Sequence, residues 1–151
     1  MPSKEQENMD GDVLGGDADR IGAYIRDTAN LMGLRDWFLV FSPDNPPLGP
    51  DYMGQCSVAP HRRVATIYLS TALRSGPEEM FQSTVVHELL HLHFVDVEYA
   101  LESLPEVVGS TAASILTTAH KHALELGIDM VAYEWSKTLP SPSAWLAEQE
   151  D

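Results

Sequence analysis

The sequence predicts an α+β fold in which a small, mostly antiparallel sheet of about three strands packs on helices. Three observations support this fold class: apolar residues at helical spacing near the N-terminus, three short strand-like runs between residues 37 and 70, and long helical stretches after residue 75. The length of 151 residues suits one domain, and a hydrophobic content of 44% supplies enough apolar side chains for one core.

The first predicted element is a helix over residues 19–32. Its apolar positions recur three or four residues apart, as one face of a helix requires, and the following Gly33 favours a helix end. The residues that set this pattern are Ile21, Ile25, Thr28 and Met32.

Three strands are predicted next, at residues 37–41, 54–59 and 64–70. The first is a compact run of apolar and aromatic residues, and a proline-rich segment separates it from the second. In the third, apolar residues alternate with more polar ones, so that one face of the strand should meet the core. The short connection between the second and third strands predicts a β-hairpin.

From residue 75 onward the pattern is helical. Ser75 and Glu78 have the spacing of a capping box, which predicts the start of a helix that runs to about residue 94. Pro105 and Gly109 interrupt the next helical stretch, and a last helix is predicted over residues 112–139.

The two ends of the chain are acidic and poor in apolar residues. Residues 1–17 are predicted to be a disordered acidic leader and residues 141–151 an acidic tail, which leaves residues 18–140 as the folded domain. The tail also contains Trp145 and Leu146, two side chains that could dock on the domain. The N-terminus lacks the basic and apolar stretches of a signal peptide, and we therefore expect a cytoplasmic protein.

The formal net charge of −14 argues against two classes of partner. Such a charge repels phosphate backbones and anionic lipid surfaces, so neither nucleic acid nor a membrane is expected as a direct partner. Cys56 is the only cysteine, which excludes an internal disulfide and a CxxC metal site. These features leave the oligomeric state open.

The most informative residues are His87-Glu88-Leu89-Leu90-His91, an HExxH motif. Residues four apart on a helix project from the same face, so His87 and His91 can bind one ion. Zinc accepts imidazole nitrogen ligands at about 2.0–2.1 Å, and a catalytic zinc site keeps one position for water. The motif therefore predicts a Zn²⁺ site with His87 and His91 as ligands.

Glu88 is the predicted catalytic residue. It is turned by about 100° from His87 around the helix axis, so it can approach a zinc-bound water without binding the metal. Zinc lowers the pKa of that water to about 7, and a neighbouring carboxylate can accept its proton and pass it to a leaving amine. The motif thus predicts a zinc-dependent peptidase whose substrate is a peptide or a protein.

A third zinc ligand must come from elsewhere in the chain. The longer HExxHxxGxxH motif is excluded because Phe94 and Val97 occupy its glycine and last-ligand positions. The preferred candidate is Glu125, because Asp129 lies one turn further on and could hold a ligand histidine by a hydrogen bond. Gly127, between them, would allow a close approach to the HExxH helix. Rival carboxylates are present at Glu98, Glu102, Glu106 and Glu134.

The HExxH motif and the downstream sequence ELGID resemble the gluzincin group of metallopeptidases, whose pattern is HExxH followed by ExxxD. The chain also resembles small single-domain HExxH peptidase-like proteins of phages and mobile elements over residues 20–140. The segments that carry this second resemblance are GQCSVAP, RVATIYLS, STVVHELLHLHF and ELGIDMVAYEWSKTL.

The resemblance implies a minimal zincin-like fold with zinc bound by His87, His91 and Glu125. Glu88 would then be the general base, and Asp129 would hold a ligand histidine. In zincins an edge strand often pairs with the extended substrate, and the resemblance points to the strand at residues 64–70 for this role. Larger gluzincins stabilise the oxyanion with a His or Tyr from a further domain, which this chain is too short to hold. The candidates here are Tyr68, Tyr99, His120, His122 and Tyr133, and nothing in the sequence selects among them.

Two other functions fit the same motif. The protein could be a catalytically silent, zinc-binding interaction or regulatory protein that keeps the fold. It could also be a latent enzyme whose active-site cleft is covered by the tail around Trp145 and Leu146.

Overall fold

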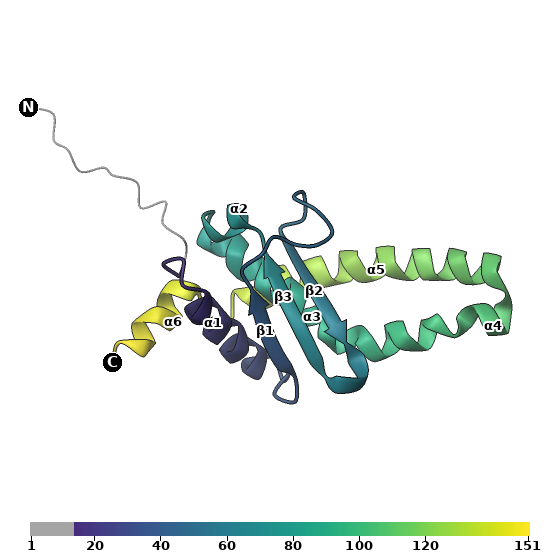
Figure 1. Cartoon of the computed structure of the whole chain (residues 1–151), viewed down its shortest axis with the longest axis horizontal. Helices are drawn as coiled ribbons and strands as arrows, with labels where there is room; N and C mark the ends of the chain where they lie inside the picture. The colour runs from purple at the N-terminus through teal and green to yellow at the C-terminus, as the bar shows by residue number, and fades with distance from the viewer. Residues whose placement is uncertain (1–13) are drawn as a thin grey trace, which may run out of the picture.

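The computed structural model describes residues 14–151, so residues 1–13 of the predicted leader lie outside the described part of the chain. Figure 1 shows α1 (Ala18–Leu31) and a small sheet followed by helices, which confirms the predicted α+β class. The strands are β1 (Phe38–Ser42), β2 (Gly54–Ala59) and β3 (Val64–Leu69), with a 3₁₀ turn, η1 (Pro60–Arg62), between the last two. The remaining helices are α2 (Thr71–Arg74), α3 (Glu78–Glu102), α4 (Leu104–Val108), α5 (Ser110–Ser136) and α6 (Pro142–Gln149).

The three strands form one sheet in the order β1–β3–β2. β2 and β3 pair antiparallel as the predicted hairpin, whereas β1 and β3 pair in parallel. The sheet is therefore mixed, with one pair of each kind, where the sequence predicts mostly antiparallel pairing. The chain between β1 and β3 is long enough to return to the starting end of β1, which is what a parallel pair requires.

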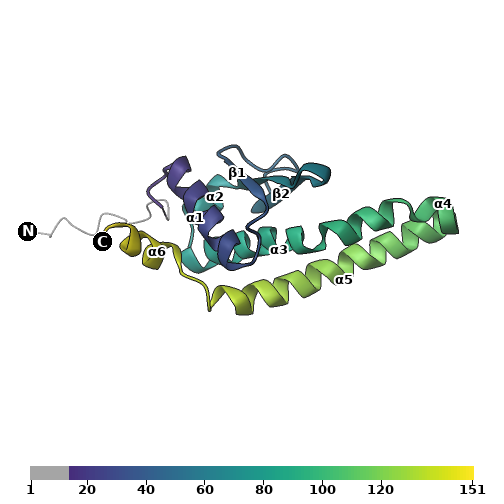
Figure 2. The same ribbon diagram turned by 90° about the horizontal axis from the view of Figure 1, so that it is seen from below.

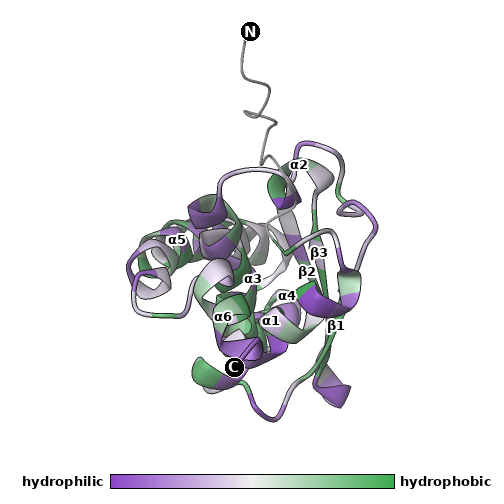
Figure 3. Cartoon of the chain, turned by 90° about the vertical axis from the view of Figure 1, so that its left-hand side faces the viewer, coloured by the Kyte–Doolittle hydropathy of each residue, from purple (hydrophilic) through white to green (hydrophobic). Residues whose placement is uncertain are grey.

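Helices cover one face of the sheet, and the main core lies between the two layers. Along β3, Ala65, Ile67 and Leu69 are fully buried, as the predicted alternation requires. On α3, Phe81, Val85 and Leu89 are fully buried as well, and they belong to the same apolar cluster. Figure 3, a view along the long axis, shows α3 in the middle, with the sheet on one side and α5 on the other. The helix with the HExxH motif is therefore the central element of the fold.

The N-terminal boundary of the folded domain lies before residue 18. Leu14 is fully buried in the core, and the carboxylate of Asp17 accepts a hydrogen bond from the backbone amide of Asp19 at the start of α1. Both residues fall in the segment predicted as the disordered leader. A buried leucine and a helix cap fix the chain from Leu14 onward.

The helix that carries the HExxH motif begins later than the sequence predicts. Ser75 ends α2, and Pro77 precedes α3 without a side-chain cap, so the predicted capping box is wrong. A residue before proline is disfavoured in the helical conformation, and this places a break at Gly76. α3 then continues to Glu102 instead of ending near residue 94, because its second half packs along α5.

α3 and α5 run side by side and extend well beyond the sheet, with α4 at the far end (Figure 2). Gly109 precedes α5 with a φ of 86°, a conformation that glycine adopts without strain. Pro105 lies in the first turn of α4, where a missing amide proton costs nothing. Among residues 14–151, none of the helices has the length and apolar character needed to cross a membrane.

The segment after residue 140 packs on the domain, where the sequence predicts a separate acidic tail. Its helix α6 buries Trp145, whose ring meets Tyr24 edge-on with the ring centroids 5.7 Å apart. The indole Nε1–H of Trp145 donates a hydrogen bond of 2.9 Å to the carboxylate of Asp27. The preceding turn is fixed too, because Gln82 donates from Nε2 to the backbone carbonyls of Ser136, Leu139 and Pro140.

Replacing Trp145 by alanine should destabilise the whole domain. The substitution removes a buried aromatic ring, which costs about 3–5 kcal/mol of unfolding free energy, and it leaves Asp27 without its indole partner. Urea unfolding measures the change. The matched control is Glu148→Ala in the same helix, an exposed position where a change within about 0.5 kcal/mol is expected. Equal stabilities of the two variants would contradict the docking of α6.

Candidate metal centre

Three side chains from two helices converge beside the centre of α3. His87 and His91 lie one turn apart on α3, and their Nε2 atoms are 3.3 Å from each other. Glu125 reaches them from α5: its Oε2 lies 3.2 Å from Nε2 of His87, and its Oε1 lies 3.2 Å from Nε2 of His91. These residues form a group that could hold a metal ion. The structure therefore brings together the three ligands that the sequence predicts.

The spacing of these donor atoms fits a small tetrahedral ion. Two ligand atoms at about 2.0–2.1 Å from such an ion lie about 3.3–3.4 Å apart. The two imidazole nitrogens are 3.3 Å apart, which matches that value, and each lies 3.2 Å from a different oxygen of the Glu125 carboxylate. A metal ion would thus need little rearrangement of these side chains.

Asp129 fixes the orientation of the first histidine. Its Oδ1 lies 2.7 Å from Nδ1 of His87, so the Nδ1–H group of His87 donates a hydrogen bond to the carboxylate. Nε2 of the same ring then presents its lone pair to His91 and to the carboxylate of Glu125. Lone pairs that face one another repel unless a proton or a cation lies between them. This argues for a metal-binding role.

The second histidine is also in the form that binds metals. Burial lowers the pKa of His91, and the nearby charge of Glu125 opposes that shift only in part. The neutral imidazole is therefore favoured near pH 7, with a lone pair available for a metal ion.

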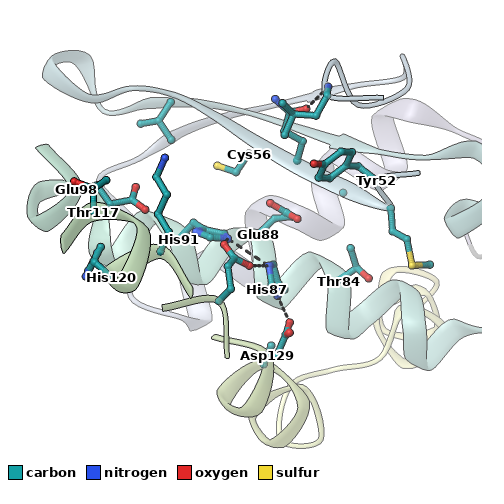
Figure 4. Close-up of a pocket in the computed structure, with 18 of the residues that line it drawn as sticks. Tyr52, Cys56, Thr84, His87, Glu88, His91, Glu98, Thr117, His120 and Asp129 are labelled. Carbon is teal, nitrogen blue, oxygen red and sulfur yellow. Dashed lines mark hydrogen bonds and ion pairs between the residues drawn. The ribbon is translucent and has the colours of Figure 1, made fainter. Parts of the chain in front are cut away.

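Glu88 lies beside the cluster on the side that faces β2, and Asp129 lies on the opposite side (Figure 4). The side chain of Glu88 is buried against Gly54: a Cβ atom at Gly54 would lie 2.9 Å from its Oε1. Only glycine permits this close approach of the strand to the carboxylate. Burial raises the pKa of Glu88 to about 8, and the charge of Glu125 adds to the effect, while a backbone hydrogen bond from Cys56 lowers it.

The cluster opens into a cleft of about 1030 Å³ between the sheet edge and the two long helices. One wall is β2 with the loop before it, and the other is formed by α3 and α5. Figure 4 shows Tyr52 on the loop side, across the cleft from the helix that carries His87. The cleft is large enough for several residues of an extended peptide.

The structure separates Glu125 from its rivals. Glu98 and Glu102 line the cleft further along α3, but they are not part of the three-residue cluster. Glu134 instead pairs with Lys137 at 3.0 Å. The reason is geometric. Of the carboxylates considered as the third ligand, only Glu125 lies on the face of α5 that meets the two histidines.

Gly127 does not have the role that the sequence suggests. A Cβ atom at this position would meet nothing within 4 Å, and the residue is exposed on α5. The close approach to α3 is made instead by other residues of α5, among them the buried Ile128 and Ala132. The prediction that Gly127 permits tight packing on the HExxH helix is wrong.

The strand suggested for substrate pairing is also different. Residues 64–69 form β3, which is central and already paired on both sides, so its backbone is not free to bind a peptide. β2 is the edge strand on the cleft side, and Gly54, Cys56 and Val58 line the cleft.

Among the sequence candidates for an oxyanion donor, His120 and Tyr133 line the cleft. Tyr52 lines it as well, and sequence reasoning missed this residue because it lies in an irregular loop. Tyr52 reaches the cleft because the loop leads directly into β2, which begins two residues later at Gly54. No residue of α6 lines the cleft, so the tail does not cover it as the latent-enzyme interpretation requires.

The purified protein should bind about one divalent metal ion per chain, and His87→Ala, His91→Ala and Glu125→Ala should each abolish this binding. Asp129→Asn should weaken it by about 10–100-fold, because the histidine loses the partner that orients it. Equilibrium dialysis with elemental analysis measures both effects. The control Glu98→Ala changes a carboxylate in the same cleft and should leave the stoichiometry intact. Equal metal binding by Glu125→Ala and the control would contradict the assignment.

In the metal-free protein, the contribution of Glu88 to stability should fall as the pH rises from about 4.5 to about 8. The folded state keeps the proton on Glu88 in this range, because the pKa of Glu88 is raised, whereas the unfolded state releases it. Glu88→Gln cannot release a proton, so the difference in unfolding free energy between the two proteins should change across this range. Urea unfolding in the presence of a chelator measures it, and a constant difference at all pH values would contradict the raised pKa.

No family model matches this chain, and no curated protein or solved structure matches it either. The structure shows His87, His91 and Glu125 in one cluster that could hold a metal ion. The interpretation of the site therefore rests on its own geometry: three converging donors, a carboxylate that orients one of them, and a buried glutamate beside them in an open cleft.

Proposed function

We propose that this protein is a zinc-dependent peptidase that hydrolyses peptide bonds. One observation carries the proposal: the buried carboxyl of Glu88 lies beside the cluster of His87, His91 and Glu125, and both face a cleft that a peptide can enter. A site that only stabilised the fold would have no need for a buried acid next to its ligands, because such a group is costly to bury.

Zinc is the metal that this donor set favours. Two imidazole nitrogens and one carboxylate oxygen are the typical protein ligands of catalytic zinc, with the fourth position free. Calcium and magnesium prefer ligand sets made of oxygen alone. The 3.3 Å separation of the two imidazole nitrogens, with a carboxylate oxygen of Glu125 3.2 Å from each, supports the same choice.

Glu88 would act as the general base and then as the general acid. When bound, the zinc ion supplies a Lewis acid that polarises a carbonyl and makes water more acidic. A cation bound at the cluster would favour the ionised form of Glu88. Its carboxylate, held against β2 beside Gly54, could then accept a proton from water and pass it to the leaving amine. Asp129 keeps the ring of His87 in the tautomer and orientation that this arrangement needs.

An extended peptide is the substrate that the cleft fits best. β2 borders the cleft and has one free edge, so a peptide strand could add to the sheet through backbone hydrogen bonds. The same wall contributes Leu48, Tyr52 and Met53, which would contact the side chains of the substrate. Tyr52 and Tyr133 both carry a hydroxyl donor on the cleft wall and are the candidates for oxyanion stabilisation.

Glu88→Gln should keep the zinc and lose the activity. The variant preserves the shape of the side chain but cannot accept a proton, so the rate of cleavage of a mixture of unstructured peptides should fall by about 10²–10⁴-fold. Mass spectrometry of the products measures cleavage, and elemental analysis measures the zinc. Glu102→Gln is the matched control in the same cleft and should cleave like the unchanged protein.

The same experiment tests the non-catalytic alternative. A protein that binds one zinc ion per chain but cleaves no peptide, with or without Glu88, would be the zinc-stabilised interaction protein and not the peptidase. Cleavage that survives both Glu88→Gln and removal of the zinc by a chelator would come from a contaminant.

A further inference from the structure

The outer face of α5 is exposed over most of its length. Only Ala113, Ile128, Ala132 and Ser136 are buried among its 27 residues. Figures 1 and 2 show why: α5 packs on α3 along one side and borders no other long element. Yet the exposed side of α5 is largely apolar, which is unusual for a helix face in contact with water.

The exposed apolar residues follow a heptad pattern. They recur at alternating intervals of four and three residues over three heptads, about six helical turns, which is the spacing of the core positions in a coiled coil. We call this set the α5 seam. It consists of Ala112, Leu116, Ala119, Ala123, Leu126, Met130 and Tyr133, all of which are exposed.

The large side chains of the α5 seam are exposed by 51–73%. Within residues 14–151, no other segment covers them. A single exposed leucine needs no explanation, but an unbroken seam without a charged residue over seven core positions is the pattern of a helix that pairs with another helix.

We propose that the α5 seam pairs with the α5 seam of a second copy of this chain, with the two helices antiparallel. The argument for a second copy is that the seam is complementary to itself. In an antiparallel pair related by a twofold axis, one register places Ala119 opposite Met130 of the other copy and Ala123 opposite its Leu126. Ala119 and Ala123 then each face a large residue, Leu116 faces Tyr133, and Ala112 falls opposite Lys137 beyond the apolar seam.

The apolar area offered by the seam is a large part of what a standard interface buries. Burying one large apolar side chain removes roughly 60–120 Å² from water. Leu116, Leu126, Met130, Tyr133 and the flanking Ile115 would together bury on the order of 300–600 Å² of apolar surface per copy. With the polar rim that interfaces also contain, this approaches the ~800 Å² per partner of a standard interface. The pair would place the two α5 helices between the two α3 helices.

The seam lies on the same helix as the third ligand of the metal cluster. Leu126 and Met130 directly follow Glu125 and Asp129, so the two sets of side chains leave α5 on different sides. Leu116, Leu126 and Met130 do not line the cleft, whereas Tyr133 borders both the seam and the cleft. Pairing through these residues would therefore hold α5 from its outer side without blocking the ligands. The inference does not depend on the proposed peptidase activity, because mass and cross-linking measure it directly.

The first experiment measures the mass of the full chain in solution by sedimentation equilibrium. We expect twice the 16.7 kDa of one chain, with association that strengthens as salt screens the net charge of −14 on each copy. Leu126→Glu should raise the dissociation constant roughly 100-fold or more, because it places like charges in an apolar interface. Phe38→Glu is the control, since Phe38 is also an exposed apolar residue but lies on the sheet. Dissociation by Phe38→Glu instead would place the interface on the sheet and overturn the proposal.

The second experiment tests the direction of the helices by disulfide cross-linking, in a Cys56→Ser background. Ala119→Cys and Met130→Cys should form a disulfide only when the two variants are mixed, because the proposed register places residue 119 of one copy opposite residue 130 of the other. Cross-linking of each variant with itself would indicate parallel helices and overturn the proposal. A monomeric protein that forms no disulfide in any combination would overturn it as well.

Discussion

The contact between two imidazoles of α3 and one carboxylate of α5 is the interaction around which the candidate site is built. It joins α3 and α5, the two long helices. His87, His91 and Glu125 lie 3.2–3.3 Å apart around a common centre, and their lone pairs need a cation or protons to balance them. The rest of the molecule can be understood as the structure that holds these groups together.

The central position of α3 explains how a polar site can exist in so small a domain. One side of this helix is buried by the sheet and α1, which fixes its axis, while the polar side faces α5 and the cleft. Glu88 lies at the border between the two environments. Its burial against Gly54 raises its pKa, and the same burial places it beside the cluster instead of in bulk water.

α5 contributes side chains to two different surfaces. Its inner side contributes Glu125 and Asp129 to the metal cluster, and its outer side presents the apolar α5 seam. The helix itself buries few side chains within its own chain, so the tertiary packing alone holds it weakly. A metal ion on one side and a second helix on the other would each fix its position, and both would act on the same element.

The sequence by itself determined what depends on local geometry. The four-residue spacing of His87 and His91 places both rings on one face of any helix, and the alternation in β3 sets the face that meets the core. The spacing of Glu125 and Asp129 already favoured Glu125 over Glu98 and Glu102, and the structure brings Glu125 to the two histidines. Only the tertiary structure decided that β2 instead of β3 has the free edge, and that α6 packs against α1 instead of over the cleft. Those choices depend on how whole elements pack, and short-range patterns in a chain carry no information about the distance between elements far apart in sequence.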